Sequence, residues 1–576
     1  MIQANYYEKN DDLKEHFEHI IDWKEIVDIY ENNFADAKEY SKSGNSRLEM
    51  APNNLEEAIQ FYQEILRSAG EVSGMYVSQA AQEIDYKGLN FENGVVTHPE
   101  IMVEMIRKYQ EAGLIPVAFQ RKYGGLGVPN VVKAIITEIM YRSDTSTTIA
   151  TSSIGLAVIL EKVATEEMCQ ELIPKFIDEN YSGTMGLSEP DFGSDLPEVK
   201  TKAIPDPNNP GKWLLTGNKR YQTLACGVNG GPGMTLVLAR TGTPESGARG
   251  LSFFIAENKD YEITGIEKKL GLKASATCEV AYENTPAILV GQQNYGLVKY
   301  VMGMLNGARL SVSSQGTGIS TAAFCEAEKY AKERIQFGKP IIEIPAVKKM
   351  LDYMEREIAA MRCFMIEAAY SVDKYLWIQD RNLPKDSPEF IEAKFWEKVA
   401  NTLTPISKYY NSETGIQVVN TGLQVLGGAG YTEDYDLARL YRDIRITNIY
   451  DGTTQIQVNA AIGGITAGMS ASGVFREYIE RLEKQGSGSK MVQSIKKSFE
   501  EVVTTFKNIE SRETKEKYSF EVVESAARLL LSLLMDRAYA KSSEERKAVR
   551  EKWNQAFHID SLAICQSNLL KLNHPS

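Results

Sequence analysis

A chain of 576 residues is too long for a single hydrophobic core, and its apolar fraction of 43% is that of a folded globular protein, so several domains are expected. The formal net charge of −13 disfavours a nucleic-acid partner and docking on an anionic membrane, because both require clustered Lys and Arg. The six cysteines are scattered without a CxxC pair, which predicts buried thiols in a reducing cytoplasm and neither a disulfide framework nor a metal site.

The first 53 residues predict a helical extension. Their apolar side chains, among them Phe17, Ile20 and Trp23, recur at helical spacing. The opening Met1–Asp12 has neither an apolar signal core nor the Arg-rich, acid-poor composition of a transit peptide. No stretch of the chain approaches the ~18 apolar residues of a membrane helix. We therefore expect a cytoplasmic protein without a transmembrane segment.

The remaining chain divides by periodicity into four further parts. Residues 54–180 keep apolar side chains at i, i+3 and i+4, which predicts an N-terminal α domain. Short β-rich runs separated by turn residues fill 181–296 and predict a middle β barrel or sandwich. Helical periodicity returns over 297–468, where we expect a four-helix bundle. An additional helical domain over 469–576 follows a break rich in Gly, Ser and Lys. The fold class is α+β.

The distribution of histidine limits the chemistry of the central region. The five histidines lie at or before position 98 or at or after position 558. A Ser-His-Asp or Cys-His mechanism is therefore excluded between them, and a zinc site there is disfavoured. Proton transfer in this region has to use Asp, Glu, Tyr, Lys or Arg.

Four short motifs occur in a fixed order along the central region. Each of them alone is typical of a turn or a helix cap. Together, in order and spacing, they resemble the fingerprint of the acyl-CoA dehydrogenase family, and the resemblance runs from about Tyr123 to Ile462. The motifs are MGLSEPDFGSD at 185–195, ERIQFGK at 333–339, QVLGGAGY at 424–431 and YDGTTQIQ at 450–457.

The resemblance implies that Asp451 is the catalytic base that removes the α-proton of an acyl-CoA. The family normally carries Glu at this point, so the carboxylate arm is shorter here by one C–C bond, about 1.5 Å. Some relatives place the base on the helix that opens the second helical domain, but the matching residue is Ala308, which has no carboxylate. The resemblance also assigns the backbone N–H of residue 451 to the thioester oxygen.

The same resemblance implies FAD as cofactor and assigns its contacts. Tyr221 stands where Trp is common, and Arg334 would reach the pyrophosphate of a neighbouring subunit's FAD, which suits a planar guanidinium. The predicted FAD contacts are Met185, Leu187, Ser188, Ser194, Tyr221, Thr223, Arg334, Gln336, Phe337, Gln424, Gly427, Gly428, Thr453 and Gln455. The predicted acyl-CoA contacts are Ser194, Asn306, Arg309, Tyr450 and Gly452. No metal is expected.

The family's long form implies the partners. Its additional C-terminal block occupies the place of a second dimer in shorter, tetrameric relatives, so a homodimer is expected. An electron-transferring flavoprotein would accept the electrons.

Two other functions stay open at this point. Nitroalkane oxidases resemble this family and use Asp where dehydrogenases use Glu, so a flavin oxidase is one of them. A non-catalytic assembly or binding partner of the same fold is the other.

Overall fold

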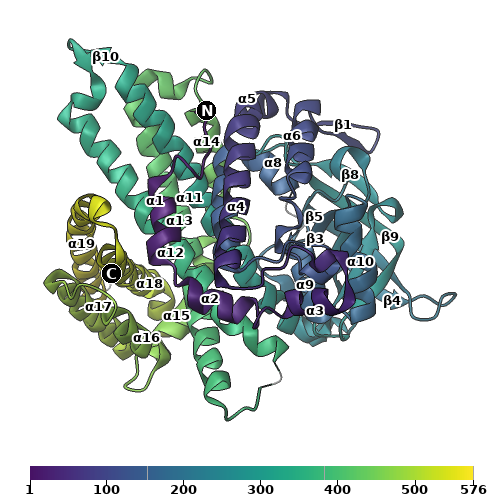
Figure 1. The fold of residues 1–576 in the computed structure, drawn as a ribbon. Helices are drawn as coiled ribbons and strands as arrows, with labels where there is room; N and C mark the ends of the chain where they lie inside the picture. The colour runs from purple at the N-terminus through teal and green to yellow at the C-terminus, as the bar shows by residue number, and fades with distance from the viewer. Residues whose placement is uncertain (152–153, 382, 575–576) are drawn as a thin grey trace. The chain divides into compact units, whose positions relative to one another are not determined.

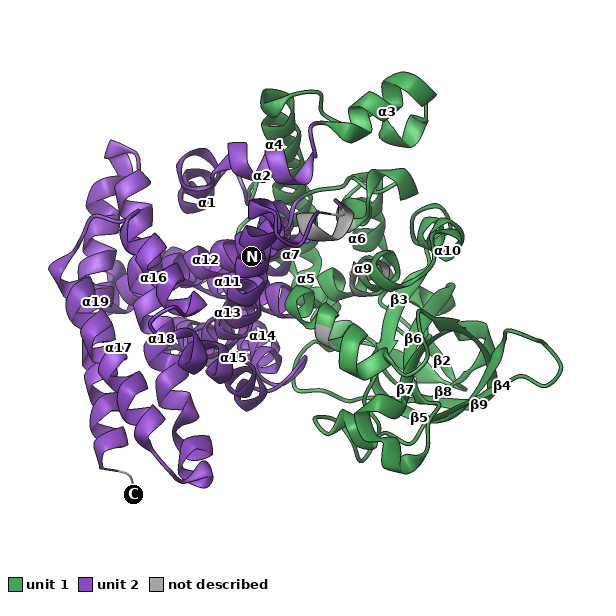
Figure 2. Ribbon diagram, turned by 90° about the horizontal axis from the view of Figure 1, so that it is seen from below, with its two compact units in different colours: residues 1–5, 34–128, 143–308 green, residues 6–33, 129–142, 309–576 purple. Residues whose placement is uncertain are grey.

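The computed structural model describes residues 1–151, 154–381 and 383–574. The chain forms two compact units and crosses between them several times (Figures 1 and 2). Unit 1 comprises residues 1–5, 34–128 and 143–308, and unit 2 comprises residues 6–33, 129–142 and 309–576. The predicted helical extension is thus divided between them. The four boundaries between the five predicted domains stay predictions.

Unit 1 combines helices with a small barrel. Its helices are α3 (Ala35–Ser43), α4 (Leu55–Val72), α5 (Ser78–Lys87), α6 (Glu100–Glu111), α8 (Thr145–Ala150), α9 (Ile154–Val163) and α10 (Glu166–Asp178). Its strands are β1 (Asn90–Glu92), β2 (Val95–Thr97), β3 (Ser182–Gly186), β4 (Lys202–Pro205), β5 (Trp213–Thr223), β6 (Gly233–Arg240), β7 (Leu251–Glu257), β8 (Glu262–Ile266) and β9 (Thr277–Val290).

The pairing of five strands closes the barrel. β6 pairs with β4, β4 with β5, β5 with β9, β9 with β7, and β7 returns to β6. β3 adds to β6 in parallel, with Met185 opposite Leu236, and β8 adds to β9. Apolar side chains such as Val237, Phe254 and Val280 fill the interior. The prediction of a middle β domain is confirmed.

One hairpin departs from the helical pattern predicted for residues 54–180. β1 and β2 pair antiparallel around Asn93 and Gly94, whose φ angles are 51° and 78°. Asn-Gly is the strongest short hairpin signal, because both residues tolerate positive φ. The strands have only three residues each, too few for a visible alternation of apolar and polar side chains.

Unit 2 is helical apart from one short hairpin. Its helices are α1 (Asp11–Glu15), α2 (Trp23–Tyr30), α7 (Asn130–Ser143), α11 (Met302–Glu333, from Arg309 onward), α12 (Pro345–Asp380), α13 (Pro388–Leu426), α14 (Asp436–Ile444), α15 (Thr454–Gly468), α16 (Val474–Glu483), α17 (Lys490–Asn508), α18 (Arg512–Lys541) and α19 (Glu544–Asn573). The hairpin strands are β10 (Ile335–Gln336) and β11 (Lys339–Pro340).

Three long helices of unit 2 are joined by the amide of one buried asparagine. Asn411 of α13 donates to Ser313 and Thr317 of α11 at 2.8 and 3.0 Å and to the carbonyl of Met361 of α12 at 2.9 Å. α15 packs against α13 as the fourth member. This arrangement confirms the predicted helix bundle.

α18 is the central helix of the appended block. It packs against α17 and α19 and also against α12 and α15. Leu529, Leu530 and Leu531 near its middle are all fully buried, so this part of the helix is apolar on more than one face. A helical segment that is apolar on all sides is surrounded by other elements. No described helix is long and apolar enough to cross a membrane.

The N-terminal segment of unit 2 is held by buried charges. Asp12 accepts from Arg550 of α19 at 2.8 Å and from Arg362 of α12. Arg362 also donates to Glu138 of α7 at 2.5 Å. All four side chains are buried, so this network joins the beginning and the end of the chain.

Candidate active site

The predicted base lies in a short loop of unit 2 between a 3₁₀ turn over 445–448 and the start of α15. Asp451 and Gly452 have φ angles of 51° and 90°. Asp is one of the few non-glycine residues that adopt a left-handed conformation at low cost. A Cβ added to Gly452 would come within 2.7 Å of the Gln457 side-chain nitrogen, so the loop requires glycine there.

Two buried side chains bind the carbonyl groups of this loop. Lys408 of α13 donates from Nζ to the Tyr450 oxygen at 2.7 Å and to the Gly452 oxygen. Gln457 of α15 donates from Nε2 to the oxygens of Asp451 and Gly452 at 3.0 and 2.9 Å. The three consecutive carbonyl oxygens of residues 450–452 therefore all accept hydrogen bonds from buried side chains.

The backbone N–H groups of the loop, unlike its carbonyl groups, make no hydrogen bond to a described residue. The N–H groups of Asp451, Gly452 and Thr453 donate to no other described residue. Successive free N–H groups before a helix N-terminus form a concentration of positive partial charge that suits an anionic oxygen. The loop therefore presents its donors while its acceptors are bound.

Arg309 fixes the orientation of the Gln457 amide. Its Nε donates to Gln457 Oε1 at 2.9 Å, and both side chains are buried. Because a guanidinium only donates, the oxygen of the amide has to face Arg309 and the nitrogen has to face the loop carbonyls. Arg309, a predicted acyl-CoA contact, thus binds Gln457, the side chain that holds the loop of Asp451.

Further contacts hold both ends of the loop. Tyr450 donates its hydroxyl to Gln315 Oε1 of α11. Glu413 of α13 accepts from Asn448 at 3.0 Å and from Thr454. Tyr450, another predicted acyl-CoA contact, is partly buried.

The electrostatics of the loop favour a carboxylate that can take up a proton. Asp451 is exposed and forms no ion pair with a described residue. Desolvation by the surrounding protein still raises the pKa of Asp451, and the charge of Lys408 acts in the opposite direction. Burial lowers the pKa of Lys408 to about 8, while Asp451 acts against that change.

In unit 1, the predicted flavin segment 185–195 is held by a second buried lysine. Lys219 of β5 donates to the Leu187 oxygen and to Glu189, each at 3.0 Å. Glu189 also accepts from the N–H and hydroxyl of Thr201 at 2.8 and 2.6 Å. The Arg220 N–H donates to the Ser188 oxygen at 3.0 Å. The segment therefore follows β5, where Tyr221 and Thr223 are located.

Tyr221 lies at an irregularity of β5. The register with β9 shifts between Lys219 and Gln222, and Tyr221 has a φ angle of 61° and a side chain that is 55% exposed. A bulge turns a side chain out of the regular alternation of a strand, and positive φ is costly for an aromatic residue. The strained backbone thus presents an aromatic ring on the surface of unit 1.

The other predicted FAD residues of unit 1 are accessible to different degrees. Met185, Leu187, Ser188 and Thr223 are partly buried, and Ser194 is exposed. A Cβ added to Gly193 would meet no atom within 4 Å, so the chain is open to close approach at this point.

The predicted FAD contacts of unit 2 are mostly exposed. Phe337 is 91% exposed and has a φ angle of 51° in the turn between β10 and β11. Arg334, Gln336, Gln424 and Gln455 are exposed, as are Gly427 and Gly428, and Thr453 is partly buried. A guanidinium and side-chain amides donate hydrogen bonds to phosphate oxygens. A Cβ added to Gly427 or Gly428 would meet no atom within 4 Å, so a phosphate group can approach the backbone there. These residues of unit 2 therefore suit the diphosphate of FAD, and in unit 1 the exposed ring of Tyr221 by itself suits an aromatic flavin.

Asn306, a predicted acyl-CoA contact, is buried on α11. It belongs to unit 1, whereas Arg309, Tyr450 and Gly452 belong to unit 2.

Sequence reasoning missed the three side chains that hold the loops, Lys408, Gln457 and Lys219. A signal for Lys408 exists, because Ile406–Tyr410 is a run of buried residues in which a charge requires a partner. Gln457 closes the fourth motif, but nothing in the sequence indicates that its amide points back to the loop.

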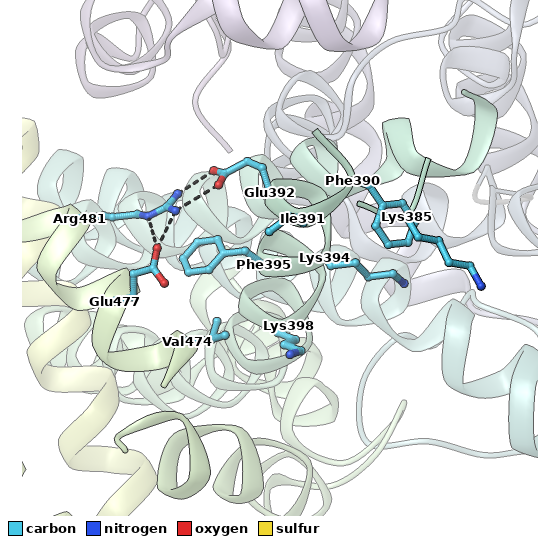
Figure 3. A pocket seen from close by; sticks show the side chains of 10 residues that line it. All are labelled: Lys385, Phe390, Ile391, Glu392, Lys394, Phe395, Lys398, Val474, Glu477 and Arg481. Carbon is cyan, nitrogen blue, oxygen red and sulfur yellow. Dashed lines mark hydrogen bonds and ion pairs between the residues drawn. The ribbon is translucent and has the colours of Figure 1, made fainter. Parts of the chain in front are cut away.

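A groove elsewhere in unit 2 contains none of the predicted site residues. It has a volume of about 330 Å³ and lies between the start of α13 and α16. Figure 3 shows Arg481 bonded to both Glu392 and Glu477 in this groove, and the guanidinium also lies 4.0 Å from the centre of the Phe395 ring. The charge of Arg481 is therefore balanced within the groove.

Comparison with known proteins identifies the family. The N-terminal, middle and C-terminal domains of acyl-CoA dehydrogenase match residues 63–180, 184–285 and 298–465. The 3-methylmercaptopropionyl-CoA dehydrogenase of Ruegeria pomeroyi is 31% identical over 444 residues, which cover 71% of this chain and 72% of the relative. The acryloyl-CoA reductase (NADH) of Anaerotignum propionicum is 32% identical over 361 residues, covering 61% and 84%.

A solved structure extends the likeness of the fold to the appended helices. The acyl-CoA dehydrogenase of Bacillus anthracis complexed with FAD has a TM-score of 0.72 at 19% identity and covers 90% of this chain and 88% of its own. The three domain matches span more than half of the chain in the family's order. The protein therefore belongs to the acyl-CoA dehydrogenase family of FAD-dependent oxidoreductases.

Proposed function

We propose that the protein oxidises an acyl-CoA thioester to the α,β-unsaturated thioester, with Asp451 as the base. The observation that carries this proposal is an exposed carboxylate that forms no ion pair with a described residue, beside three backbone N–H groups that donate to none of the described residues. A base and an oxyanion site are what removal of a proton next to a thioester carbonyl needs. Family membership supports the thioester as substrate.

The chain's own groups divide the reaction between them. Asp451 takes the proton from Cα, and the loop N–H groups stabilise the negative charge that develops on the thioester oxygen. Bound FAD would supply the acceptor for the hydride of Cβ, and we propose an electron-transferring flavoprotein as the external acceptor of the electron pair. Asp451 afterwards returns its proton to solvent.

Anaerobic mixing of the purified flavoprotein with a panel of acyl-CoA thioesters tests this proposal. The panel starts from 3-methylmercaptopropionyl-CoA and propionyl-CoA, the saturated form of acryloyl-CoA, because the names of two relatives contain these acyl groups. It then extends to the CoA thioesters of longer and branched acids. We expect at least one thioester to remove the visible absorbance of the flavin. Unchanged absorbance with every thioester would refute the proposed function.

One specific observation favours a flavin oxidase as the second candidate. The residue at the base position is Asp, as the resemblance to nitroalkane oxidases requires. Aerobic mixing with a nitroalkane and measurement of hydrogen peroxide decides between the two. Rapid peroxide formation without any thioester oxidation would replace the dehydrogenase by the oxidase.

We also propose a homodimer with shared flavin sites. The exposed side chains of Arg334, Gln336 and Phe337 support contacts with the FAD of a second copy. The test is to co-express Asp451→Asn and Arg334→Ala chains. If the sites are shared, mixed dimers contain one intact site and regain activity that neither variant has alone. No recovery in verified mixed dimers would contradict this arrangement.

A further inference from the structure

Lys408 is a buried cation beneath the base loop. Only 1% of its surface is exposed, and Nζ is bonded to the oxygens of Tyr450 and Gly452. The charged groups that act on it are Asp451, Arg309 of α11 and Glu413 of its own helix. None of the carboxylates among them forms an ion pair with it, and Glu413 is already bonded to Asn448 and Thr454.

Binding of the carbonyls alone does not explain a charged side chain at this position. Gln457 binds the oxygens of Asp451 and Gly452 with a neutral amide. A buried ammonium group loses its hydration, which is costly unless an opposite charge lies nearby. The loop that Lys408 holds carries one exposed carboxylate, that of Asp451.

We infer that Lys408 is a positioning residue for the proposed base, which it serves both by binding the loop carbonyls and by its positive charge. The bonds to residues 450 and 452 hold Asp451 between them in its left-handed conformation, with the carboxylate exposed and the N–H groups free. The charge favours the ionised carboxylate that accepts the α-proton. This inference rests on the proposed function, because it needs Asp451 as the base.

The charge has a second consequence in each reaction cycle. When Asp451 has taken the proton from Cα, Lys408 remains a buried cation with one negative neighbour fewer. The favourable interaction is restored when Asp451 releases the proton to solvent. Lys408 thus favours the return of the base to its starting state.

Three substitutions separate binding from charge. Lys408→Met removes both, Lys408→Gln removes the charge and keeps a donor, and Lys408→Arg keeps the charge. Lys374→Met is the matched control. Lys374 is also a buried lysine of unit 2 whose pKa burial lowers to about 8, but it pairs with Glu25 of α2.

The first readout is the pH dependence of flavin reduction by a reactive thioester. We expect the acidic limb of the profile to move to higher pH in Lys408→Met and Lys408→Gln, because the carboxylate loses its positive neighbour. Lys408→Arg and Lys374→Met should retain the limb of the unmodified protein. A limb that stays in place in Lys408→Gln would overturn the role of the charge, even if the rate falls.

The second readout is amide hydrogen exchange of residues 449–454 in FAD-free protein. We expect faster exchange in Lys408→Met, intermediate exchange in Lys408→Gln and no change in Lys374→Met. Equal exchange in all variants would overturn the positioning role. If Lys408→Met does not fold, Lys408→Gln against Lys408→Arg gives the same decision.

The two proposals fail separately in these experiments. If the unmodified protein reduces its flavin with no thioester, the proposed function fails, while hydrogen exchange still reports on the loop. If the unmodified protein is reduced but both readouts are unchanged in the Lys408 variants, only the role of Lys408 is wrong.

Discussion

Each unit holds a predicted site segment by a buried lysine, and the two lysines differ in what balances their charge. Lys219 forms an ion pair with Glu189 at 3.0 Å, and the carboxylate also accepts three hydrogen bonds from Lys200 and Thr201. Lys408 binds carbonyls, and its carboxylate neighbour Asp451 is exposed and pairs with no residue that the structure describes. The pKa of each lysine is lowered to about 8 by burial.

This difference separates a carboxylate held in a structural ion pair from one that forms no ion pair with a described residue. A carboxylate that is surrounded by donors has little tendency to take up a proton, whereas desolvation without donors raises that tendency. The comparison therefore predicts that changes at Glu189 act on stability and that changes at Asp451 act on chemistry.

The largest effect is expected from Asp451→Asn. The rate of flavin reduction should fall roughly 10²–10⁴-fold, because a general base contributes about that much. Flavin content and the far-ultraviolet circular dichroism spectrum should not change. Rapid-mixing absorbance measures the rate, and an unaltered rate would remove Asp451 from the mechanism.

Glu189→Gln is the matching change in unit 1. It leaves Lys219 buried without a negative partner, so the free energy of unfolding should fall by about 3 kcal/mol. Denaturant unfolding of FAD-free protein measures this difference. The double variant Lys219→Met/Glu189→Leu should recover only the part of the loss that comes from the unpaired lysine, since the donors of Lys200 and Thr201 still lack their acceptor. A Glu189→Gln variant as stable as the unmodified protein would contradict the structural role.

The pH dependence of stability should have opposite signs at the two carboxyls. Desolvation raises the pKa of Asp451 above 3.8, so the folded state binds its proton more tightly, and the unfolding free energy falls as pH rises from 3.8 through the folded pKa. For Glu189, burial acts upward, but Lys219 and the Thr201 hydrogen bonds hold the pKa below 4.5. Its contribution to stability is therefore complete above 4.5 and is lost as pH falls through the folded pKa.

Unfolding midpoints from neutral pH to about pH 4 measure both signs. Relative to the unmodified protein, Asp451→Asn should be stabilised at neutral pH and Glu189→Gln destabilised. Both differences should shrink toward acid. Parallel curves for the two variants would show that the carboxyls do not differ as described.

The smallest effect is expected at Tyr221. Tyr221→Gly should stabilise FAD-free protein by about 1 kcal/mol, because glycine adopts the positive φ angle without strain. The same change should weaken FAD binding, since the exposed ring is lost. Thermal unfolding and flavin titration measure the two effects, and a destabilised variant with unchanged FAD affinity would contradict both.

The sequence predicted the parts of the fold and site that depend on local patterns. The short β-rich runs predicted over 181–296 lie in strands such as β5, β6 and β7, and the helical periodicity beyond residue 469 lies in α16 to α19. The candidate base and the glycines near it could be named because their motif is continuous in the chain, and their roles stay predictions.

The remaining features depend on contacts between distant residues. Lys408 lies 42 positions before Tyr450, and Arg309 lies 148 positions before Gln457. No periodicity or spacing indicates that these side chains meet. The left-handed conformations of Tyr221 and Phe337 are likewise imposed by a bulge and a tight turn, because neither residue favours positive φ by itself.

The ion pair between Asp12 and Arg550 has a consequence for folding during synthesis on the ribosome. The two residues are 538 positions apart. At ordinary elongation rates, the first emerges about half a minute to two minutes before the second. During that interval Asp12 lacks its partner in α19. The network that joins α19 to the N-terminal segment of unit 2 therefore forms late in the synthesis of this unit.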